Sequence, residues 1–184
     1  NSNETLSVIN PATEEVICDI SLGNQSDLDT AVAAARNAFI NYSKSSKEDK
    51  LNILERIISS YKKRMNDLSN AVTIEMGAPK TLSEKAQVPS GLGHFMQAKK
   101  ILENFSFEKE VNSSIVQKEP VGVCGLITPW NWPLNQIACK VAPALAAGCT
   151  MILKPSEEAP LSAIIFAEII EDAELPDGIF NLIN

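Results

Sequence analysis

The sequence is poor in the residues that usually build metal sites and nucleic-acid surfaces. It contains one histidine, His94, with no acidic or thiol partner at ligand spacing, so no metal site is expected. Aspartate and glutamate (23) outnumber lysine and arginine (16), and the formal net charge is −7. Because binding to a phosphate backbone needs a clustered basic footprint, no nucleic-acid partner is expected either.

Long apolar runs and targeting segments are also missing. No stretch approaches the ~18 consecutive apolar residues of a membrane span, so we expect no membrane partner. The opening NSNETLSVIN has neither the basic start nor the apolar core of a secretory signal. The cysteines form no C-x-x-C pair, and they are Cys18, Cys124, Cys139 and Cys149. We interpret them as free thiols in a reducing compartment, which predicts a cytoplasmic protein, and we expect the last three to be buried and inert.

One nucleotide-binding pattern is absent as well. No G-x-G-x-x-G follows a strand, so glycines that would cradle a phosphate are not visible. What remains is an ordinary globular composition, with 45% hydrophobic and 21% charged residues. A chain of 184 residues with this composition is long enough for one domain with a sizeable core.

The pattern in the first third of the chain predicts a hairpin followed by helices. Short apolar strands within residues 5–21 flank turn-forming residues at 10–14. A capping box from Ser26 to Asp29 opens one amphipathic helix, and Ser46 opens a second.

A proline and two glycines complicate the segment that follows. Residues 81–105 keep a helical rhythm in spite of Pro89, Gly91 and Gly93, so we expect one helix that is kinked or restarted near Pro89. Residues 107–119 are mostly polar and alternate loosely, which predicts an exposed hairpin or edge arm.

The chain is organised around residues 121–157, which predict a β-α-β unit. Residues 121–127 are an apolar run, residues 134–147 are rich in Ala and Leu, Gly148 stands at the helix C-cap position, and residues 151–153 are a second apolar run. Continuously apolar strands of this kind are buried on both faces, and the right-handed crossover makes them parallel. The polar turns after the two strands then lie side by side at the carboxyl edge, where open α/β sheets bind ligands.

A helix at 160–171 and a strand at 179–183 extend this unit to β-α-β-α-β. The predicted fold class is therefore α/β, with a Rossmann-like parallel sheet flanked by helices and with an N-terminal hairpin and helical layer. Since the last strand is terminal, one side of the sheet is left unfinished. We expect the chain to be the front part of a larger domain or to fold against another chain.

The first polar turn, residues 128–133, has the sequence TPWNWP. Its two prolines fix φ and remove two N–H donors, so the turn is stiff enough to hold a side chain in one pose. The candidate is Asn131, whose amide could donate a hydrogen bond to a developing oxyanion. The alternative is an asparagine that bonds to its own turn, with Trp130 and Trp132 simply packing.

The second polar turn begins at Lys154 and includes Ser156 and Glu157. A lysine at a strand end, next to a helix N-terminus, opposes the helix macrodipole unless an anion or a hydroxyl-rich ligand is near. Lys154 and Glu157 could together bond the two hydroxyls of a ribose, and the carboxylate would repel a 2′-phosphate. The alternative is a surface ion pair that contributes little.

These segments together resemble one family. In chain order they are VINPAT (8–13), EMGAP (75–79), ITPWNWP (127–133), APALAAG (142–148), LKPSE (153–157) and LPDGIFNLIN (175–184). Their order and spacing are similar to those of the NAD(P)-dependent aldehyde dehydrogenase superfamily. The resemblance covers essentially the whole chain, and the combined set of motifs is highly specific.

The resemblance implies roles for individual residues. Asn131 matches the oxyanion-hole asparagine, which stabilises the thiohemiacetal oxygen. Lys154 and Glu157 match the pair on the adenosine ribose, with Ser156 beside them. The segment beside the cofactor is matched by Ile127, Thr128, Pro129 and Trp130.

The resemblance also implies an activity and a division of the chain. Members of the family oxidise aldehydes: a cysteine thiolate attacks the carbonyl, a hydride passes to nicotinamide, and a glutamate activates the water that releases the acid. The resemblance implies a small-molecule aldehyde as substrate, NAD as cofactor (with NADP as the alternative) and a homo-oligomer. Residues 1–106 correspond to the N-terminal part of the cofactor-binding domain, 107–119 to an oligomerisation arm and 120–184 to the β-α-β-α-β cofactor-binding segment.

The catalytic domain of the family, with its cysteine nucleophile and glutamate base, follows the point at which this sequence ends. We therefore expect an incomplete aldehyde dehydrogenase fold that is inactive alone, because covalent catalysis needs its nucleophile. Two alternatives remain. One is a non-catalytic nucleotide-binding or interaction fragment on the same scaffold, and the other is an acyl-CoA-forming relative in which a thiol replaces water.

Overall fold

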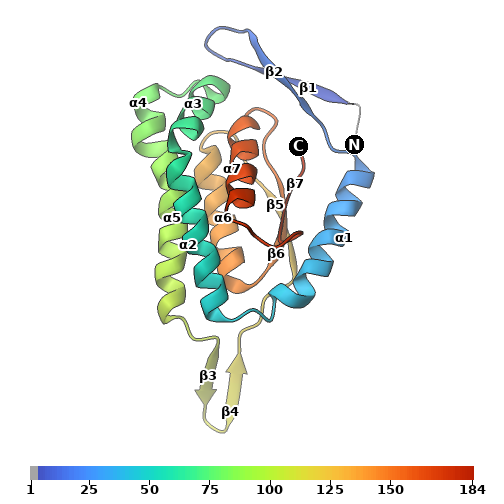
Figure 1. Ribbon diagram of the computed structural model, residues 1–184, viewed down its shortest axis with the longest axis vertical. Helices are drawn as coiled ribbons and strands as arrows, with labels where there is room; N and C mark the ends of the chain where they lie inside the picture. The colour runs from blue at the N-terminus through green and yellow to red at the C-terminus, as the bar shows by residue number, and fades with distance from the viewer. Residues whose placement is uncertain (1–3) are drawn as a thin grey trace.

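The computed structural model describes residues 4–184, so the first three residues of the expected N-terminal region lie outside the described part. A three-stranded parallel sheet is flanked by helices, and two separate hairpins lie at opposite ends of the molecule (Figure 1). The predicted α/β fold class is confirmed. The strands are β1 (Thr5–Ile9), β2 (Val16–Ser21), β3 (Glu108–Val111), β4 (Ser114–Gln117), β5 (Val123–Ile127), β6 (Thr150–Lys154) and β7 (Phe180–Leu182). The helices are α1 (Gln25–Tyr42), α2 (Lys47–Lys63), α3 (Met65–Met76), α4 (Lys80–Leu82), α5 (Val88–Asn104), α6 (Pro133–Ala147) and α7 (Leu161–Asp172).

The parallel sheet has the strand order β5-β6-β7, which confirms the predicted β-α-β-α-β unit. Helix α6 connects β5 to β6, and α7 connects β6 to β7. The central strand β6 is buried from Thr150 to Leu153. Strand β5 lies at the sheet edge and is only partly covered, with Ile127 77% exposed. The expectation that both strands are buried on both faces is therefore confirmed for β6 and wrong for β5, since an edge strand has a neighbouring strand on one side only.

Helices cover the two faces of the sheet unequally. Helix α1 lies on one side, and α2, α5, α6 and α7 lie on the other (Figure 1). On the α1 side, Ala35 packs with Ile152, and Thr150 Oγ1 donates to Ala35 O at 2.8 Å. On the opposite side, Met151 and Leu153 are fully buried in the main apolar core. Successive residues of β6 thus serve two layers, as the alternation of a strand requires.

Local sequence explains where several helices begin and end. Helix α1 begins with a capping box formed by Asn24 and Asp27. The predicted box at Ser26 and Asp29 is wrong, because Asn24 is the residue with extended backbone and its Oδ1 accepts from the Asp27 N–H at 3.0 Å. Helix α6 ends as predicted at Gly148, whose φ of 91° is in the left-handed region.

The expected kink near Pro89 takes a different form. Helix α4, a π-helical turn (Ser83–Gln87) and α5 follow one another directly along the chain. The irregularity is the wide π turn, which ends before Pro89. Pro89 itself stands in the first turn of α5 and supplies no N–H donor to the helical hydrogen-bond pattern there.

Both predicted hairpins are present. Strands β1 and β2 pair antiparallel near the N-terminus, and β3 and β4 pair antiparallel within residues 107–119. Every residue of β3 and β4 is exposed, and this hairpin, called the arm below, projects away from the body of the molecule (Figure 1). Within residues 4–184, no helix is both long and apolar enough to cross a membrane.

Candidate functional site

The two polar turns lie side by side at the carboxyl edge of the parallel sheet. In the register of β5 and β6, Ile127 stands opposite Lys154. The Thr128 N–H donates to Lys154 O at 3.2 Å, so the first turn leaves its strand directly against the end of the next one. The predicted site residues all lie at or just after these two strand ends: Ile127, Thr128, Pro129, Trp130, Asn131, Lys154, Ser156 and Glu157.

The first turn presents its polar side chain to the surface. Pro129, Trp130 and Asn131 are exposed, and Pro133 begins α6. Among the residues that the structure describes, none is hydrogen-bonded to the Asn131 side-chain amide, whereas Asn131 O accepts from Gln87 Nε2 at 3.5 Å. Asn131 thus does not bond to its own turn. Its amide group is available to donate to a ligand, while its backbone is held from behind.

The second turn contains a preformed ion pair. Lys154 Nζ and Glu157 Oε2 are 2.8 Å apart, with side chains 45% and 60% exposed, so water screens the pair and its contribution to stability is small. The hydrogen bond from Lys154 lowers the pKa of Glu157, which keeps this carboxylate ionised at neutral pH. Ser156 Oγ accepts from the Glu158 N–H at 3.3 Å and closes the turn. An ammonium donor and a carboxylate acceptor are therefore adjacent at the sheet edge.

A buried carboxyl group from the helical layer holds the start of α7. Glu75 is 3% exposed, and its Oε2 accepts from the Leu161 N–H at 2.5 Å while its Oε1 accepts from the Ser162 N–H at 3.1 Å. These N–H groups belong to the first turn of α7, where no partner exists within the helix. Desolvation raises the pKa of Glu75 to about 7, although the hydrogen bonds act in the opposite direction. Glu75 thus connects α3 to the helix that follows the second turn.

Sequence reasoning missed both supporting residues, Glu75 and Gln87. Gln87 is 1% exposed in the π turn, and its Nε2 lies 3.5 Å from both Asn131 O and Met76 Sδ. The contact of Gln87 with Asn131 spans 44 positions, and that of Glu75 with Leu161 spans 86. No local pattern marks such pairs. The one available signal was a polar residue at an inward-facing position of an amphipathic helix.

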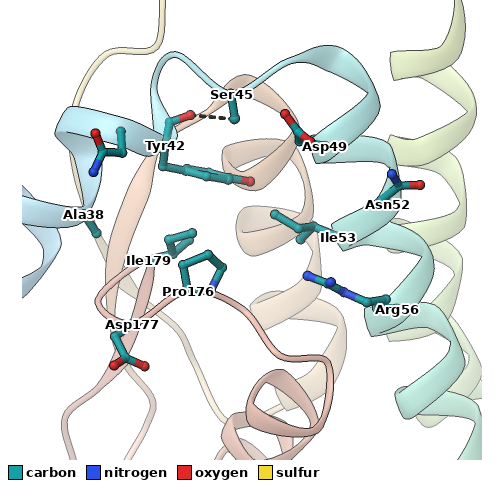
Figure 2. Close-up of a pocket in the computed structure, with 11 residues that line it drawn as sticks. Ala38, Tyr42, Ser45, Asp49, Asn52, Ile53, Arg56, Pro176, Asp177 and Ile179 are labelled. Carbon is teal, nitrogen blue, oxygen red and sulfur yellow. Dashed lines mark hydrogen bonds between the residues drawn. The ribbon is translucent and has the colours of Figure 1, made fainter.

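A separate cavity lies away from the two turns. It has a volume of about 490 Å³ and opens between the end of α1, the start of α2 and the residues before β7, hence at the amino edge of the sheet (Figure 2). Its polar groups are largely engaged by the protein itself. Tyr42 Oη donates to Leu145 O at 2.9 Å, and Arg56 Nη2 donates to Glu174 O at 3.2 Å. These contacts stabilise the packing of α1 and α2 and do not resemble a reaction centre.

The thiols are free but unevenly buried. Cys149 is buried, Cys124 and Cys139 are half-buried, and Cys18 is exposed on β2. The expectation of burial is confirmed for Cys149 and wrong for Cys124 and Cys139. Cys124 is only half-buried because it lies on β5, which is an edge strand. Within residues 4–184, no group of three or more His, Cys, Asp or Glu side chains is arranged to hold a metal ion.

Comparisons with known proteins agree with this architecture. The profile described as the aldehyde dehydrogenase family matches residues 1–184. The chain is 53% identical over 178 residues to 3-succinoylsemialdehyde-pyridine dehydrogenase of a Pseudomonas species, a match that covers 96% of this chain and 37% of that protein. An aldehyde dehydrogenase from Bartonella henselae superimposes with a TM-score of 0.97 at 46% identity, covering 100% of this chain and 39% of that one.

A second solved structure, a mutant of aldehyde dehydrogenase C from Pseudomonas syringae in complex with NAD+ and octanal, superimposes with a TM-score of 0.98 at 46% identity. This match covers 100% of this chain and 38% of the chain of aldehyde dehydrogenase C. The chain thus spans less than two-fifths of the length of each of these relatives. Because the family profile matches the sequence from its first residue to its last, and these folds superimpose over all of it, the chain belongs to the aldehyde dehydrogenase family.

Proposed function

We propose that this chain forms the cofactor-side part of an enzyme that oxidises an aldehyde to a carboxylic acid, with NAD(P) as oxidant and through a thiohemiacetal. The observation that carries the proposal is the pairing of two turns at one sheet edge. One turn offers the available amide of Asn131, and the other offers the ion pair of Lys154 and Glu157. The family to which the chain belongs supports the same reaction class.

Asn131 is assigned the role of stabilising negative charge on the aldehyde oxygen while the carbonyl carbon is attacked. A donor that is already in place stabilises this charge without reorganising during the reaction. Pro129 and Pro133 stiffen the turn, and Gln87 contacts its backbone, which together support a fixed amide position.

Lys154 and Glu157 are assigned to the adenosine ribose of the cofactor. The carboxylate accepts from one ribose hydroxyl, and the ammonium donates to the other. Because Glu157 is ionised at neutral pH, it disfavours a 2′-phosphate, and NAD is therefore proposed over NADP. Ser156 lies beside this pair, and the segment alongside the cofactor comprises Ile127, Thr128, Pro129 and Trp130. When bound, NAD accepts the hydride that the aldehyde carbon loses.

A small-molecule aldehyde is the proposed substrate class, and the octanal complex of aldehyde dehydrogenase C supports it. The thiol nucleophile and the carboxylate base are assigned to residues outside this chain. Cys124 lies early in β5, Cys139 lies within α6 and Cys149 precedes β6, so none of these three follows a strand at the carboxyl edge. We expect the 184 residues by themselves to bind NAD and to form no NADH from an aldehyde. Saturable NADH formation by the purified chain would contradict this assignment.

The ribose assignment is tested with Glu157→Gln, measured by calorimetric titration with NAD and with NADP. Hydrogen bonds to charged groups contribute about 1.5–3 kcal/mol, so NAD binding should weaken by about tenfold or more. Loss of the carboxylate charge should also narrow the preference for NAD over NADP. Glu158→Gln, the adjacent exposed residue, is the matched control and should leave both affinities unchanged. An unchanged NAD/NADP ratio in Glu157→Gln would remove the pair from the cofactor site.

A further inference from the structure

A second cavity, distinct from the proposed cofactor site, lies where the arm joins the body. Its volume is about 530 Å³, within the range of about 300–1,000 Å³ that is usual for small-molecule sites. The segment between α1 and α2 forms one wall, and the foot of the arm with Pro120 forms another. The foot of the arm leads into the amino end of β5, whereas the two polar turns follow the carboxyl ends of β5 and β6, so this cavity lies at the opposite end of the sheet from the turns.

The charge of this cavity is opposite to that of the chain. Four lysines line it (Lys44, Lys47, Lys50 and Lys118) against one acidic residue, Glu119, although the net charge of the chain is −7. Within the described part of the chain, none of these lysines forms an ion pair with a carboxylate. Four like charges therefore gather in one concave place, and the lining contributes a single carboxylate, Glu119.

Two of these lysines are held in place by groups that leave their charge uncompensated. Lys47 Nζ donates to the backbone oxygens of Glu103 and Phe105, at 3.2 and 3.0 Å. Lys118 Nζ lies 4.6 Å from the centroid of the Phe105 ring. Carbonyl dipoles and ring faces orient an ammonium group but do not neutralise it. The lysines are thus positioned at the cavity wall and remain available to an anion.

Lys50 is the deepest of the four. It is 6% exposed, and its Nζ lies 5.0 Å from the centroid of the Phe107 ring, which also lines the cavity. A Cβ placed at Gly148 would be 3.2 Å from this Nζ, so the ammonium is enclosed between the arm and the end of α6. The neighbouring carboxylate of Asp49 accepts from Ser46 N and Ser46 Oγ, at 3.0 and 2.6 Å, and is thereby committed to the helix cap.

A buried ammonium without a carboxylate partner costs free energy, and the cost is relieved when an anion joins it. Burial lowers the pKa of Lys50, although the nearby charge of Asp49 acts in the opposite direction. A single carboxylate would leave most of the local positive charge uncompensated, whereas a phosphate group carries up to two negative charges and several acceptor oxygens. Lysine ammonium groups bind phosphate as mobile point charges.

We propose that the cavity at the base of the arm binds a small phosphorylated or pyrophosphate-bearing molecule, with Lys50 at its floor and Lys44, Lys47 and Lys118 around it. This site does not depend on the proposed oxidation of an aldehyde. It would place a phosphate ligand at the opposite end of the sheet from the turns of Asn131 and Glu157, next to the segment that projects from the body.

Inorganic pyrophosphate is the probe, titrated calorimetrically into the purified protein at low ionic strength. Saturable binding at one site is expected, and Lys44→Gln/Lys118→Gln should weaken it by about tenfold or more, because each removes a charge-assisted contact. The matched control is Lys62→Gln/Lys63→Gln, which removes the same charge from the last turn of α2. Binding in the control should change by less than about twofold, since exposed charges beyond about 10 Å are largely screened.

Lys50→Met tests the floor of the cavity, because it keeps the side-chain length and removes the charge. It should abolish saturable binding while leaving the far-ultraviolet circular dichroism spectrum unchanged. If this variant does not fold, the surface pair Lys44→Gln/Lys118→Gln decides the question alone. Absence of saturable binding to the wild type, or equal weakening in the control, overturns the proposal. Loss of pyrophosphate binding whenever the protein assembles would also overturn the proposal. That result would indicate that acidic residues of a second copy fill the cavity instead.

Discussion

At the scale of single residues, Asn131 connects the proposed chemistry to one hydrogen-bond donor. Its side chain is exposed in the turn between β5 and α6, and its backbone oxygen contacts Gln87 Nε2 at 3.5 Å. In the complete enzyme, Asn131→Ala should lower kcat by about 10²–10³, which is the usual loss when one oxyanion donor is removed. The measurement is steady-state NADH formation with a saturating aldehyde.

A second asparagine supplies the control for this change. Asn135 stands four residues further along the chain, in the first turn of α6, where its Nδ2 lies 3.0 Å from His94 Nε2 and so is already engaged. Asn135→Ala should therefore leave kcat within a few-fold of the wild type. If Asn131→Ala behaves in the same way as Asn135→Ala, Asn131 is not the oxyanion donor.

Glu75 leads to a prediction about pH. Its pKa is raised by desolvation to about 7 from an ordinary value of 4.5, so the folded protein binds this proton more tightly than the unfolded chain does. The resulting stabilisation is complete below about pH 4.5 and is lost as the pH rises through about 7. The shift in the pKa of Glu75 lowers the free energy of unfolding by on the order of 3 kcal/mol between low pH and pH values above 7.

Glu75→Gln keeps an acceptor oxygen for the first turn of α7 and carries no charge at any pH. We expect this variant to be more stable than the wild type at pH 8 and to lose most of that advantage at pH 5. Urea denaturation at both pH values measures the effect. Glu110→Gln, on the exposed β3 strand, is the control and should show no such dependence. An advantage of Glu75→Gln that is the same at both pH values would mean that the carboxyl does not titrate in this range.

At the scale of elements, α5 contains two glycines with opposite environments. A Cβ at Gly91 would lie 2.5 Å from Tyr61 Oη and 3.2 Å from Leu134 O, because α5 approaches α2 and α6 closely there. Nothing lies within 4 Å of a Cβ at Gly93, on the same helix. The sequence pattern treated both as interruptions, but only Gly91 is required by packing.

Gly91→Ala should therefore destabilise the protein by about 1–3 kcal/mol, since the added methyl group overpacks the helix contact. It should also displace Tyr61 Oη from Val88 O, to which it donates at 2.9 Å. Gly93→Ala should instead stabilise the protein by up to about 1 kcal/mol, because alanine favours a helix interior. Thermal unfolding of both variants measures whether each substitution raises or lowers the stability of the protein. Destabilisation of similar size in both variants would refute the packing argument.

At the scale of the whole molecule, the arm leaves its apolar side chains exposed within residues 4–184. Ile115 is 69% exposed and Val116 is 50% exposed on β4. We propose that the arm pairs with a second copy of the protein, as the resemblance implies for residues 107–119. Isolated two-stranded hairpins are marginally stable in water, so a partner would also stabilise the arm itself.

Ile115→Asp should shift the protein toward a smaller species in sedimentation velocity, because a charge cannot be buried in an apolar contact without a partner. Its circular dichroism spectrum should stay unchanged, since the side chain makes little contact with the body. Ser113→Asp, in the turn of the arm, introduces the same charge and should leave assembly intact. The proposal fails if both variants assemble like the wild type.

The sequence by itself determined the sheet-forming unit and the place of its two turns. Local features are sufficient for this: apolar runs of strand length, a helix between them, prolines at its start and Gly148 at its end. Parallel pairing follows from the helical crossover, which returns the chain to the starting end of the sheet, so Ile127 and Lys154 had to end at the same edge.

The tertiary structure decided how that edge is supported and where charge accumulates. Glu75 reaches α7 across 86 positions and Gln87 reaches Asn131 across 44. Lys50 is buried next to Phe107 and the end of α6, which lie far from it in the sequence. Exposure of β5 likewise depends on the absence of a second neighbouring strand within the described residues. Such contacts form when elements that are far apart in the sequence pack together. Hydrophobic periodicity and turn residues describe only local segments of the chain, so they cannot predict which distant residues meet.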